Sequence, residues 1–222
     1  MKIFIGYDSR EPLAFHVLAH SILRRTDAPL QIIPLVLPAL RAQGVYTRDR
    51  GPTESTEFSL TRFLVPYLSH YEGYSLFMDC DMLCLTDIER VFDLAISQDV
   101  PVSVVKHDYV PSTETKFLGQ VQTRYPMKNW SSLMVFNNRW CKTLDPAFVR
   151  DASPATLHRF GWVDGEVGKL PAIYNWLVGE YPRNDAAKIL HYTLGGPWFG
   201  ETFNCDHSRE WLEERDHMLR CG

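Results

Sequence analysis

Short apolar runs alternate along the chain with amphipathic stretches from the first residues to the last quarter of the sequence. The runs typical of buried strands lie at 2–6, 30–37, 73–79, 100–107, 131–138 and 188–192. Apolar positions at helical spacing lie between them and at the end, at 12–25, 59–68, 87–95 and 208–219. Strands that alternate with helices predict an α/β fold with a mostly parallel sheet flanked by helices.

Turn and cap residues refine this pattern. Asp8 or Ser9 is placed to cap the first helix, and Pro34 favours an edge position for the second strand. The stretches 39–58 and 108–128 are polar and rich in turn residues, which predicts two long loops. No internal repeat, low-complexity tract or linker interrupts the sequence, so we expect a single domain over 1–222.

The composition and net charge of the chain argue against nucleic acid and anionic membranes as partners. The 222 residues are 45% hydrophobic and 23% charged, as in ordinary globular proteins, and the formal net charge is -4. A net negative chain has no overall electrostatic attraction to nucleic acid or to an anionic membrane. Any site for a phosphorylated ligand must therefore be local.

The cysteines and the chain ends favour a cytoplasmic protein. The five cysteines are an odd number and lack the paired close spacing of a structural zinc site, so we read them as reduced, mostly buried side chains. The apolar run at the N-terminus is too short for a signal peptide, and no run approaches the roughly 20 residues of a membrane span. The final helix has mixed charge and predicts at most peripheral membrane contact.

The sharpest chemical signal is the segment FMDCDML. Asp79 and Asp81 come at the end of an apolar strand, where ligands bind in open α/β sheets. Side chains two positions apart lie on the same face of a continuing strand, but here the strand is ending, and a bend decides whether both carboxylates reach one ion. A divalent cation bound to a diphosphate would offset their repulsion. The alternative is that both residues cap the following turn and helix.

A second signal is the segment ILHYTLGGPWF. His191 ends the last predicted strand and could give a neutral nitrogen to the same ion. Gly195 and Gly196 would let backbone N–H groups approach a phosphate, and Trp198 could line the site. The alternatives are that His191 is a hydrogen-bonded core residue, that the two glycines form an ordinary turn, and that Trp198 belongs to the core.

These segments together resemble the glycosyltransferases of family 8, the group that contains glycogenin and bacterial lipopolysaccharide galactosyltransferases. The similar segments follow in the family's order over most of the chain: FIGYDSRE, SLTRFLVPYL, MDCDML, SSLMVFNN, VDGEVGKLP and HYTLGGPW. The resemblance implies the GT-A fold, a Rossmann-like nucleotide-binding architecture. It also implies a nucleotide-binding half at 1–110 and an acceptor-binding half at 111–222.

The resemblance assigns roles to individual residues. Tyr7 and Asp8 would contact the base and ribose of the donor, and Arg62 would lie near the diphosphate and the metal carboxylates. Asp79, Asp81 and His191 would be the metal ligands. Asp164 and Glu166 would lie near the transferred sugar as catalytic groups, the alternative being a solvated acidic turn.

Two departures separate this chain from the family pattern. Trp130, Ser131 and Ser132 stand where the family often has asparagine before Ala-Gly. Gly196 replaces the lysine that usually precedes Pro-Trp, and that segment is one residue shorter. Such a lysine would neutralise charge on the leaving diphosphate, so its loss changes the expected donor site.

The resulting prediction is a glycosyltransferase that depends on Mn²⁺ or Mg²⁺. It would move a sugar from a nucleoside-diphosphate donor, by resemblance UDP, to a glycan, lipid-linked or protein acceptor with retention. A nucleotide-sugar-binding module without catalysis is one alternative, favoured by the missing lysine. A nucleotidyltransferase is the other, but its basic, glycine-rich loop is absent from GYDSRE. Nucleic acid is not an expected partner.

Overall fold

The computed structural model of the protein describes residues 1–51, 54–109 and 126–220. Its main sheet has the strand order β2-β1-β3-β6-β5-β7. These strands are β1 (Lys2–Gly6), β2 (Gln31–Leu35), β3 (Tyr74–Met78), β5 (Val102–Val105), β6 (Leu133–Asn137) and β7 (Val167–Leu170). Pairing is parallel except at β6, which runs antiparallel to both neighbours. The predicted α/β fold with a mostly parallel sheet in one domain is confirmed.

The strand directions bring polar segments together at one edge of the main sheet. Met78 at the end of β3 pairs with Leu133 at the start of β6, and Val104 near the end of β5 pairs with Met134. The residues that follow β1, β3 and β5 therefore lie at the same edge as those that precede β6. We call this the carboxyl edge. The strands themselves are almost wholly buried, which accounts for their continuous apolar character.

A second, smaller sheet lies beside the carboxyl edge. Its order is β4-β9-β8, with β4 (Met82–Cys84), β8 (Trp176–Leu177) and β9 (Ile189–His191). β4 follows β3 after only three residues and pairs antiparallel with β9, Met82 opposite His191. The chain therefore leaves the main sheet at residue 79 and enters the small sheet at residue 82.

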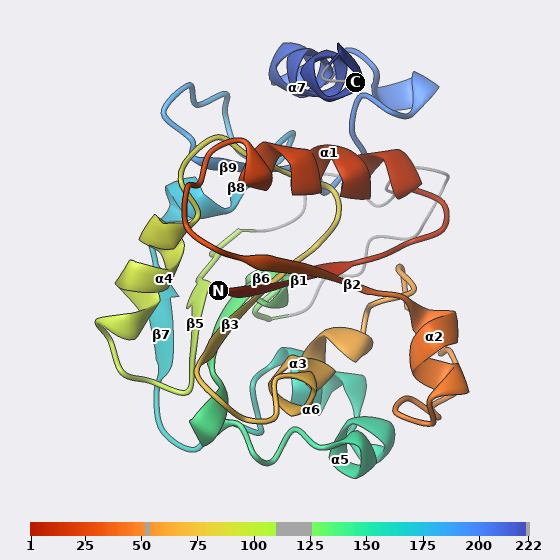
Figure 1. The fold of residues 1–222 in the computed structure, drawn as a ribbon, viewed down its shortest axis with the longest axis vertical. Helices are drawn as coiled ribbons and strands as arrows, with labels where there is room; N and C mark the ends of the chain where they lie inside the picture. The colour runs from red at the N-terminus through yellow and green to blue at the C-terminus, as the bar shows by residue number, and fades with distance from the viewer. Residues whose placement is uncertain (52–53, 110–125, 221–222) are drawn as a thin grey trace.

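Helices cover both faces of the main sheet (Figure 1). The helix α1 (Pro12–Leu23) lies over one face, with α7 (Ser208–Arg220) beyond it. On the other side lie α3 (Val65–Leu68), α5 (Pro146–Asp151) and α6 (Pro154–His158), while α4 (Glu89–Ile96) packs against β3, β6 and β7. A second apolar cluster joins α1, the small sheet and α7 through Val17, Leu190 and the fully buried Trp211.

Several local predictions need correction. The helix α2 (Leu37–Ala42) occupies the start of the predicted loop 39–58, because Pro38 suits a first helical turn and Leu40 is buried. Neither Asp8 nor Ser9 caps α1, whose N-cap residue is Glu11 without a side-chain cap. The strands β4, β7 and β8 are short, and the apolar pattern did not predict them. Most of the predicted loop 108–128 lies outside the described residues.

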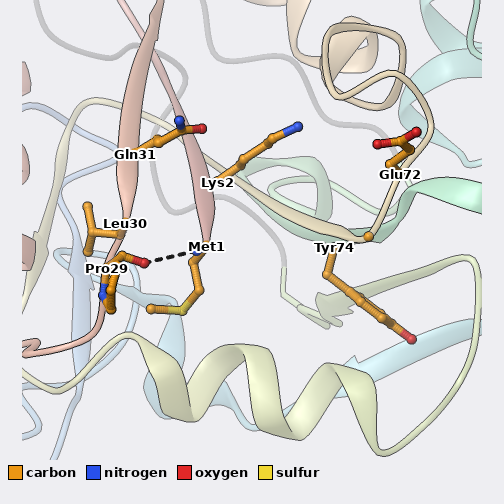
Figure 2. A pocket seen from close by; sticks show the side chains of 8 residues that line it. Met1, Lys2, Pro29, Leu30, Gln31, Glu72 and Tyr74 are labelled. Atoms are coloured by element: carbon orange, nitrogen blue, oxygen red, sulfur yellow. Dashed lines mark hydrogen bonds between the residues drawn. The ribbon is translucent and has the colours of Figure 1, made fainter.

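A hollow of about 490 Å³ opens at the amino ends of β1, β2 and β3 (Figure 2). Met1, Lys2, Gln31 and Tyr74 line it, and the terminal amino group of Met1 donates to the carbonyl of Pro29 at 3.0 Å. This hollow is at the edge opposite the carboxyl edge, and no residue predicted for the functional site lines it. Among the described residues, no helix is long and apolar enough to cross a membrane.

A buried carboxylate fastens α7 to α1. Glu214 is only 2% exposed, and its oxygens lie 2.6 Å from His20 Nδ1, 2.7 Å from Arg25 Nη2 and 3.1 Å from Arg24 Nη1. Burial alone would raise the pKa of Glu214, but the hydrogen bonds from Arg25 and His20 and the arginine charges outweigh it and hold the pKa below its usual value. The ionised form therefore stabilises the fold.

We expect Glu214→Gln to lower the free energy of unfolding by about 2 kcal/mol at pH 7, since hydrogen bonds to a charged group are lost. A depressed carboxyl pKa gives stability that is complete above the unfolded value and disappears as pH falls through the folded value. The difference between the two proteins in urea unfolding should thus shrink toward about pH 3. Glu213→Gln is the matched control, because Glu213 is 69% exposed and lies 3.7 Å from Arg209 in an exposed pair. Equal effects of the two substitutions would contradict the role of Glu214.

Candidate metal and nucleotide site

The segment between β3 and β4 carries the two predicted metal carboxylates. The backbone bends at Cys80 and Asp81, directly after the last residue of β3. Asp79 N donates to Ser132 O at 2.9 Å and Tyr192 N donates to Asp81 O at 2.8 Å, so both ends of the bend are held by neighbouring strands. The bend that the acidic pair needs in order to face one ion is therefore present.

His191 joins these carboxylates because β9 pairs with β4. One donor atom each from Asp79, Asp81 and His191 lies within 4.8 Å of the others, and His191 Nε2 is 3.4 Å from Asp81 Oδ1. Both aspartate side chains are 14% exposed and His191 is 2% exposed. Sequence reasoning thus placed together three residues that are distant along the chain.

A chain of hydrogen bonds orients His191. Its Nδ1 donates to Asn175 Oδ1 at 2.9 Å, Asn175 Nδ2 donates to Ser132 Oγ at 2.8 Å, and Ser132 Oγ donates to Asn129 O at 2.7 Å. This network assigns the proton to Nδ1 and leaves the Nε2 lone pair toward Asp81. Asn175 was not predicted, because nothing in its local sequence distinguishes it from an ordinary turn residue.

Arg62 holds the other carboxylate. Its Nη1 lies 2.8 Å from Asp79 Oδ1 and also donates to Ser131 O at 2.8 Å. The guanidinium carbon is 5.3 Å from the Phe58 ring centre and 4.9 Å from that of Phe77, which provides cation–π contacts in a buried position. The predicted proximity of Arg62 to the metal carboxylates is thus present in the structure.

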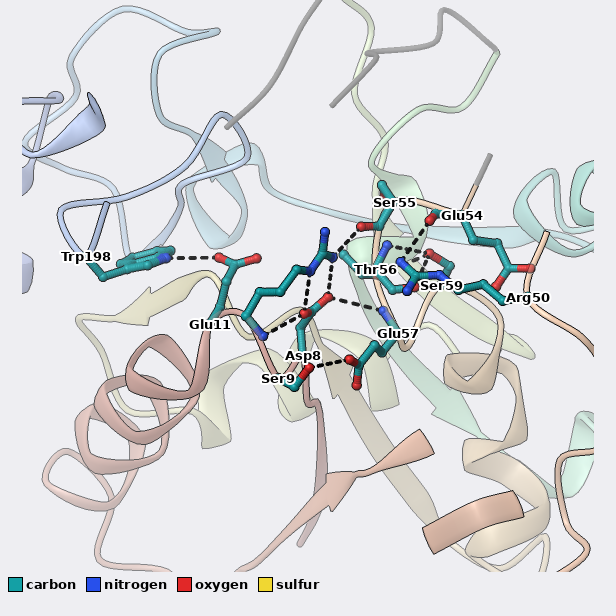
Figure 3. A network of polar contacts seen from close by, with 11 residues as sticks. Asp8, Ser9, Glu11, Arg50, Glu54, Ser55, Thr56, Glu57, Ser59 and Trp198 are labelled. Atoms are coloured by element: carbon teal, nitrogen blue, oxygen red, sulfur yellow. Dashed lines mark hydrogen bonds and ion pairs between the residues drawn. The ribbon is translucent and has the colours of Figure 1, made fainter. Parts of the chain in front are cut away.

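The turn after β1 is bound to the segment 54–59 (Figure 3). Asp8 is fully buried, and it accepts from Arg10 Nε at 2.8 Å, from Arg10 Nη2 at 2.6 Å and from Glu57 N at 3.2 Å. Arg10 Nη2 also donates to Ser55 O. Tyr7 is half-buried against Phe15, with ring centres 5.5 Å apart. Asp8 therefore secures this turn through Arg10 and the backbone N–H of Glu57.

A carboxylate that the sequence did not single out borders the same site. Glu11 is 2% exposed and accepts from Trp198 Nε1 at 3.0 Å (Figure 3). Burial first, and then the negative charges of Asp81 and Asp8, raise the pKa of Glu11 to about 8. An acidic residue just before Pro12 reads from the sequence as part of a helix start, so its approach to Asp81 was not foreseeable.

The glycine turn lies directly after β9. Gly195 has φ +104°, a conformation that favours glycine, and its N–H donates to Tyr192 O at 2.8 Å. That N–H is therefore used within the turn. Gly196 is buried beneath the ring of Trp198.

His107, which follows β5 at the carboxyl edge, is also buried. Its Nδ1 lies 2.9 Å from the Tyr181 hydroxyl, and its carbonyl accepts from Trp130 Nε1 at 2.8 Å. Burial, and then the charge of His191, lower the pKa of His107 to about 3, so its ring is neutral at pH 7. This histidine holds two aromatic side chains beside the site.

The structure does not bring Asp164 and Glu166 to the metal carboxylates. Both are exposed in the turn that precedes β7. Because β7 is parallel to β5, with Val167 opposite Val102 and Leu170 opposite Val105, this turn lies at the edge opposite the carboxyl edge. The strand register, which the sequence did not reveal, separates them from the site.

We call Asp79, Asp81 and His191 the triad, and their donor atoms suit a divalent cation. Two carboxylates and one imidazole nitrogen are ligands that Mn²⁺ and Mg²⁺ accept. Arg10 pairs with Asp8 and Arg62 with Asp79, and the negative charges of Asp81 and Asp8 add to burial in raising the pKa of Glu11. A cation at the triad would offset this repulsion between carboxylates.

Another histidine–carboxylate group, formed by Asp185, His207 and Glu210, lies away from the carboxyl edge. Arg183 Nη2 is 2.8 Å from Asp185 Oδ1 and 2.7 Å from Glu210 Oε1. A cationic side chain thus already bridges these acids, and the group is an ordinary ion-pair cluster.

The fold is similar to those of known glycosyltransferase structures. The bifunctional glycosyltransferase WbbM superposes with a TM-score of 0.63 and 16% identity, over 97% of this chain and 49% of that chain. GlyE from Streptococcus pneumoniae TIGR4 gives 0.63 and 15%, over 98% and 62%. The galactosyltransferase LgtC gives 0.62 and 11%, over 98% and 96%. The chain spans about half of WbbM and less than two thirds of GlyE. The predicted GT-A fold is confirmed.

A closer relative is a plant protein. The chain belongs to the family of Protein CDI from Arabidopsis thaliana, to which it is 45% identical over 223 residues, covering 97% of this chain and 86% of that protein. That name states no activity. No protein-family model matches the sequence.

Proposed function

We propose that the protein is a metal-dependent glycosyltransferase that moves a sugar from a UDP-sugar to a glycan, lipid-linked or protein acceptor. The observation that carries this proposal is the meeting of Asp79, Asp81 and His191 donor atoms within 4.8 Å at the carboxyl edge of a GT-A sheet. Ligands of open α/β sheets bind at this edge, so the triad lies where the donor diphosphate is expected. Uridine and retention follow from the ordered family 8 resemblance.

The residues of this chain would contribute by binding and orientation. Asp79, Asp81 and His191 Nε2 would hold Mn²⁺ or Mg²⁺, which when bound offsets the negative charge that develops on a departing diphosphate. Arg62 fixes Asp79 and adds a positive charge near it. Asn175 keeps the His191 lone pair available for the ion. Tyr7 borders the expected base position, whereas Asp164 and Glu166 take no part in this arrangement.

Calorimetric titration of UDP with and without Mn²⁺ tests the proposal. We expect binding in the micromolar range that requires the metal, because Arg10 and Arg62 are already bound to carboxylates. ADP and GDP serve as controls for the base. Slow hydrolysis of UDP-sugars, measured as UDP release without acceptor, should then identify the donor.

The outcomes separate the alternatives. Metal-dependent UDP binding without hydrolysis or transfer of any UDP-sugar would favour a binding module. Absence of UDP binding under both conditions would contradict the uridine assignment.

A further inference from the structure

Glu11 and Trp198 connect two segments that are 187 positions apart. Glu11 is the N-cap residue of α1 and stands at the end of the turn that contains Tyr7 and Asp8. Trp198 follows the glycine turn after β9 and donates its indole N–H to Glu11 Oε2 at 3.0 Å. Because Glu11 is 2% exposed, water competes little for this bond, and it fixes the ring relative to α1.

The ring of Trp198 lies directly on Gly196. A Cβ atom built on Gly196 would be 2.1 Å from Trp198 Cζ3 and 2.3 Å from Cη2, which no packing tolerates. The backbone of Gly196 is not in the left-handed region, so an alanine there would be disfavoured by the ring and not by its own φ. The glycine is thus required by the position of the tryptophan.

The same ring packs on the residue that follows β9, the strand that supplies His191. Trp198 meets Tyr192 edge to face, with ring centres 5.7 Å apart, and Trp211 at 5.1 Å. Tyr192 directly follows His191, and its N–H donates to Asp81 O at 2.8 Å. A displacement of the Trp198 ring would therefore move Tyr192 and, with it, His191 and Asp81.

We propose that Glu11 is a positioning residue of the donor site: its hydrogen bond holds Trp198 over Gly196 and so fixes the β9 segment, with His191 and Asp81, against the turn after β1. This inference rests on the proposed function, because it concerns the same metal and diphosphate site. Glu11 contributes as a hydrogen-bond acceptor for the indole. Gly196 contributes by having no side chain.

Four single variants test the positioning role. Glu11→Leu removes the acceptor, and Gly196→Ala pushes the ring away while leaving Glu11 intact. Glu11→Gln keeps an acceptor oxygen but cannot ionise. Gly200→Ala is the matched control for the alanine, because a Cβ at Gly200 meets nothing within 4 Å. The indole N–H resonance of Trp198, assigned by its loss in Trp198→Phe, reports the ring, and calorimetry with UDP and Mn²⁺ reports the site.

We expect Glu11→Leu and Gly196→Ala to shift the Trp198 resonance and to raise the Kd for UDP with Mn²⁺ about tenfold, the equivalent of one lost hydrogen bond. Glu11→Gln and Gly200→Ala should stay within about threefold of the wild type. Combining Glu11→Leu with Gly196→Ala should weaken binding little further, since both displace the same ring.

Each contrary result has a distinct meaning. Wild-type affinity in both Glu11→Leu and Gly196→Ala would overturn the inference and leave the proposed function standing. Equal losses in Glu11→Gln and Glu11→Leu would assign the effect to charge and overturn the hydrogen-bond role. A wild-type protein that does not bind UDP with Mn²⁺ would refute the proposed function. The Trp198 indole resonance would then test whether Glu11 positions the ring. If this resonance were unchanged in both Glu11→Leu and Gly196→Ala, the positioning role would be wrong.

Discussion

Asp81→Asn should abolish metal-dependent binding of UDP in calorimetry and lower the rate of sugar transfer or donor hydrolysis by at least about a hundredfold. An amide is a neutral and weaker ligand for a hard cation than a carboxylate, and Asp81 faces both His191 and the position of the ion. The substitution also removes a negative charge that raises the pKa of the buried Glu11. The thermal midpoint without metal should therefore be equal to or above that of the wild type, which separates loss of function from loss of fold.

Asp185→Asn is the matched control. Asp185 also lies beside a histidine and a glutamate, but Arg183 bridges that group and Asp185 is 79% exposed. We expect the Asp185→Asn variant to bind UDP with the affinity and the metal dependence of the wild type. If Asp81→Asn retained metal-dependent UDP binding, the acidic pair would be a structural element of the turn and the metal assignment would be wrong.

Arg62→Met should lower the free energy of unfolding by about 3 kcal/mol, the typical effect of removing one partner of a buried ion pair. Arg62 is 5% exposed and is bonded to the Asp79 carboxylate and to Ser131 O. Methionine fills a similar volume between Phe58 and Phe77, so the loss should arise from charge and hydrogen bonding more than from a cavity. Urea unfolding without metal measures the change.

Two comparisons sharpen this prediction. Arg62→Lys keeps a cation but loses the planar fork, and should give an intermediate loss. Arg139→Met removes an exposed ion pair, in which Arg139 and Asp99 are 61% and 63% exposed, and should change stability by less than about 0.5 kcal/mol. Similar losses in Arg62→Met and Arg139→Met would contradict a buried pair that holds Asp79 in place.

The structure explains why Gly196 stands where the family 8 pattern has a lysine. The Trp198 ring occupies the space into which a side chain at 196 would extend, and the indole bonds to Glu11. Two nearby cations, Arg10 and Arg62, are paired with aspartates. In this chain, charge on the donor diphosphate is therefore expected to be offset chiefly by a divalent cation, which is why the predicted metal requirement is strict.

The sequence by itself determined the fold class and singled out the three side chains that meet at the carboxyl edge. Buried strands are continuous apolar runs, so five of the six strands of the main sheet could be predicted from local composition, and Pro34 marked the edge strand correctly. The short strand β7 and the order of the strands could not be predicted in this way. Asp79, Asp81 and His191 end such runs, and strand ends converge at one edge of an α/β sheet. This rule places Asp79 and Asp81 at the carboxyl edge, whereas His191 reaches them through the pairing of β9 with β4 in the small sheet.

The tertiary structure alone decided which other side chains reach the site. Asn175 and Glu11 meet His191 and Trp198 through contacts between segments far apart in the sequence, and neither residue has a local signal. The register of β7 carries Asp164 and Glu166 to the opposite edge, because strand direction and pairing depend on packing of the whole sheet. A sequence records periodicity and residue chemistry, whereas hydrogen-bond partners and the distance between strand ends arise only when the chain is folded.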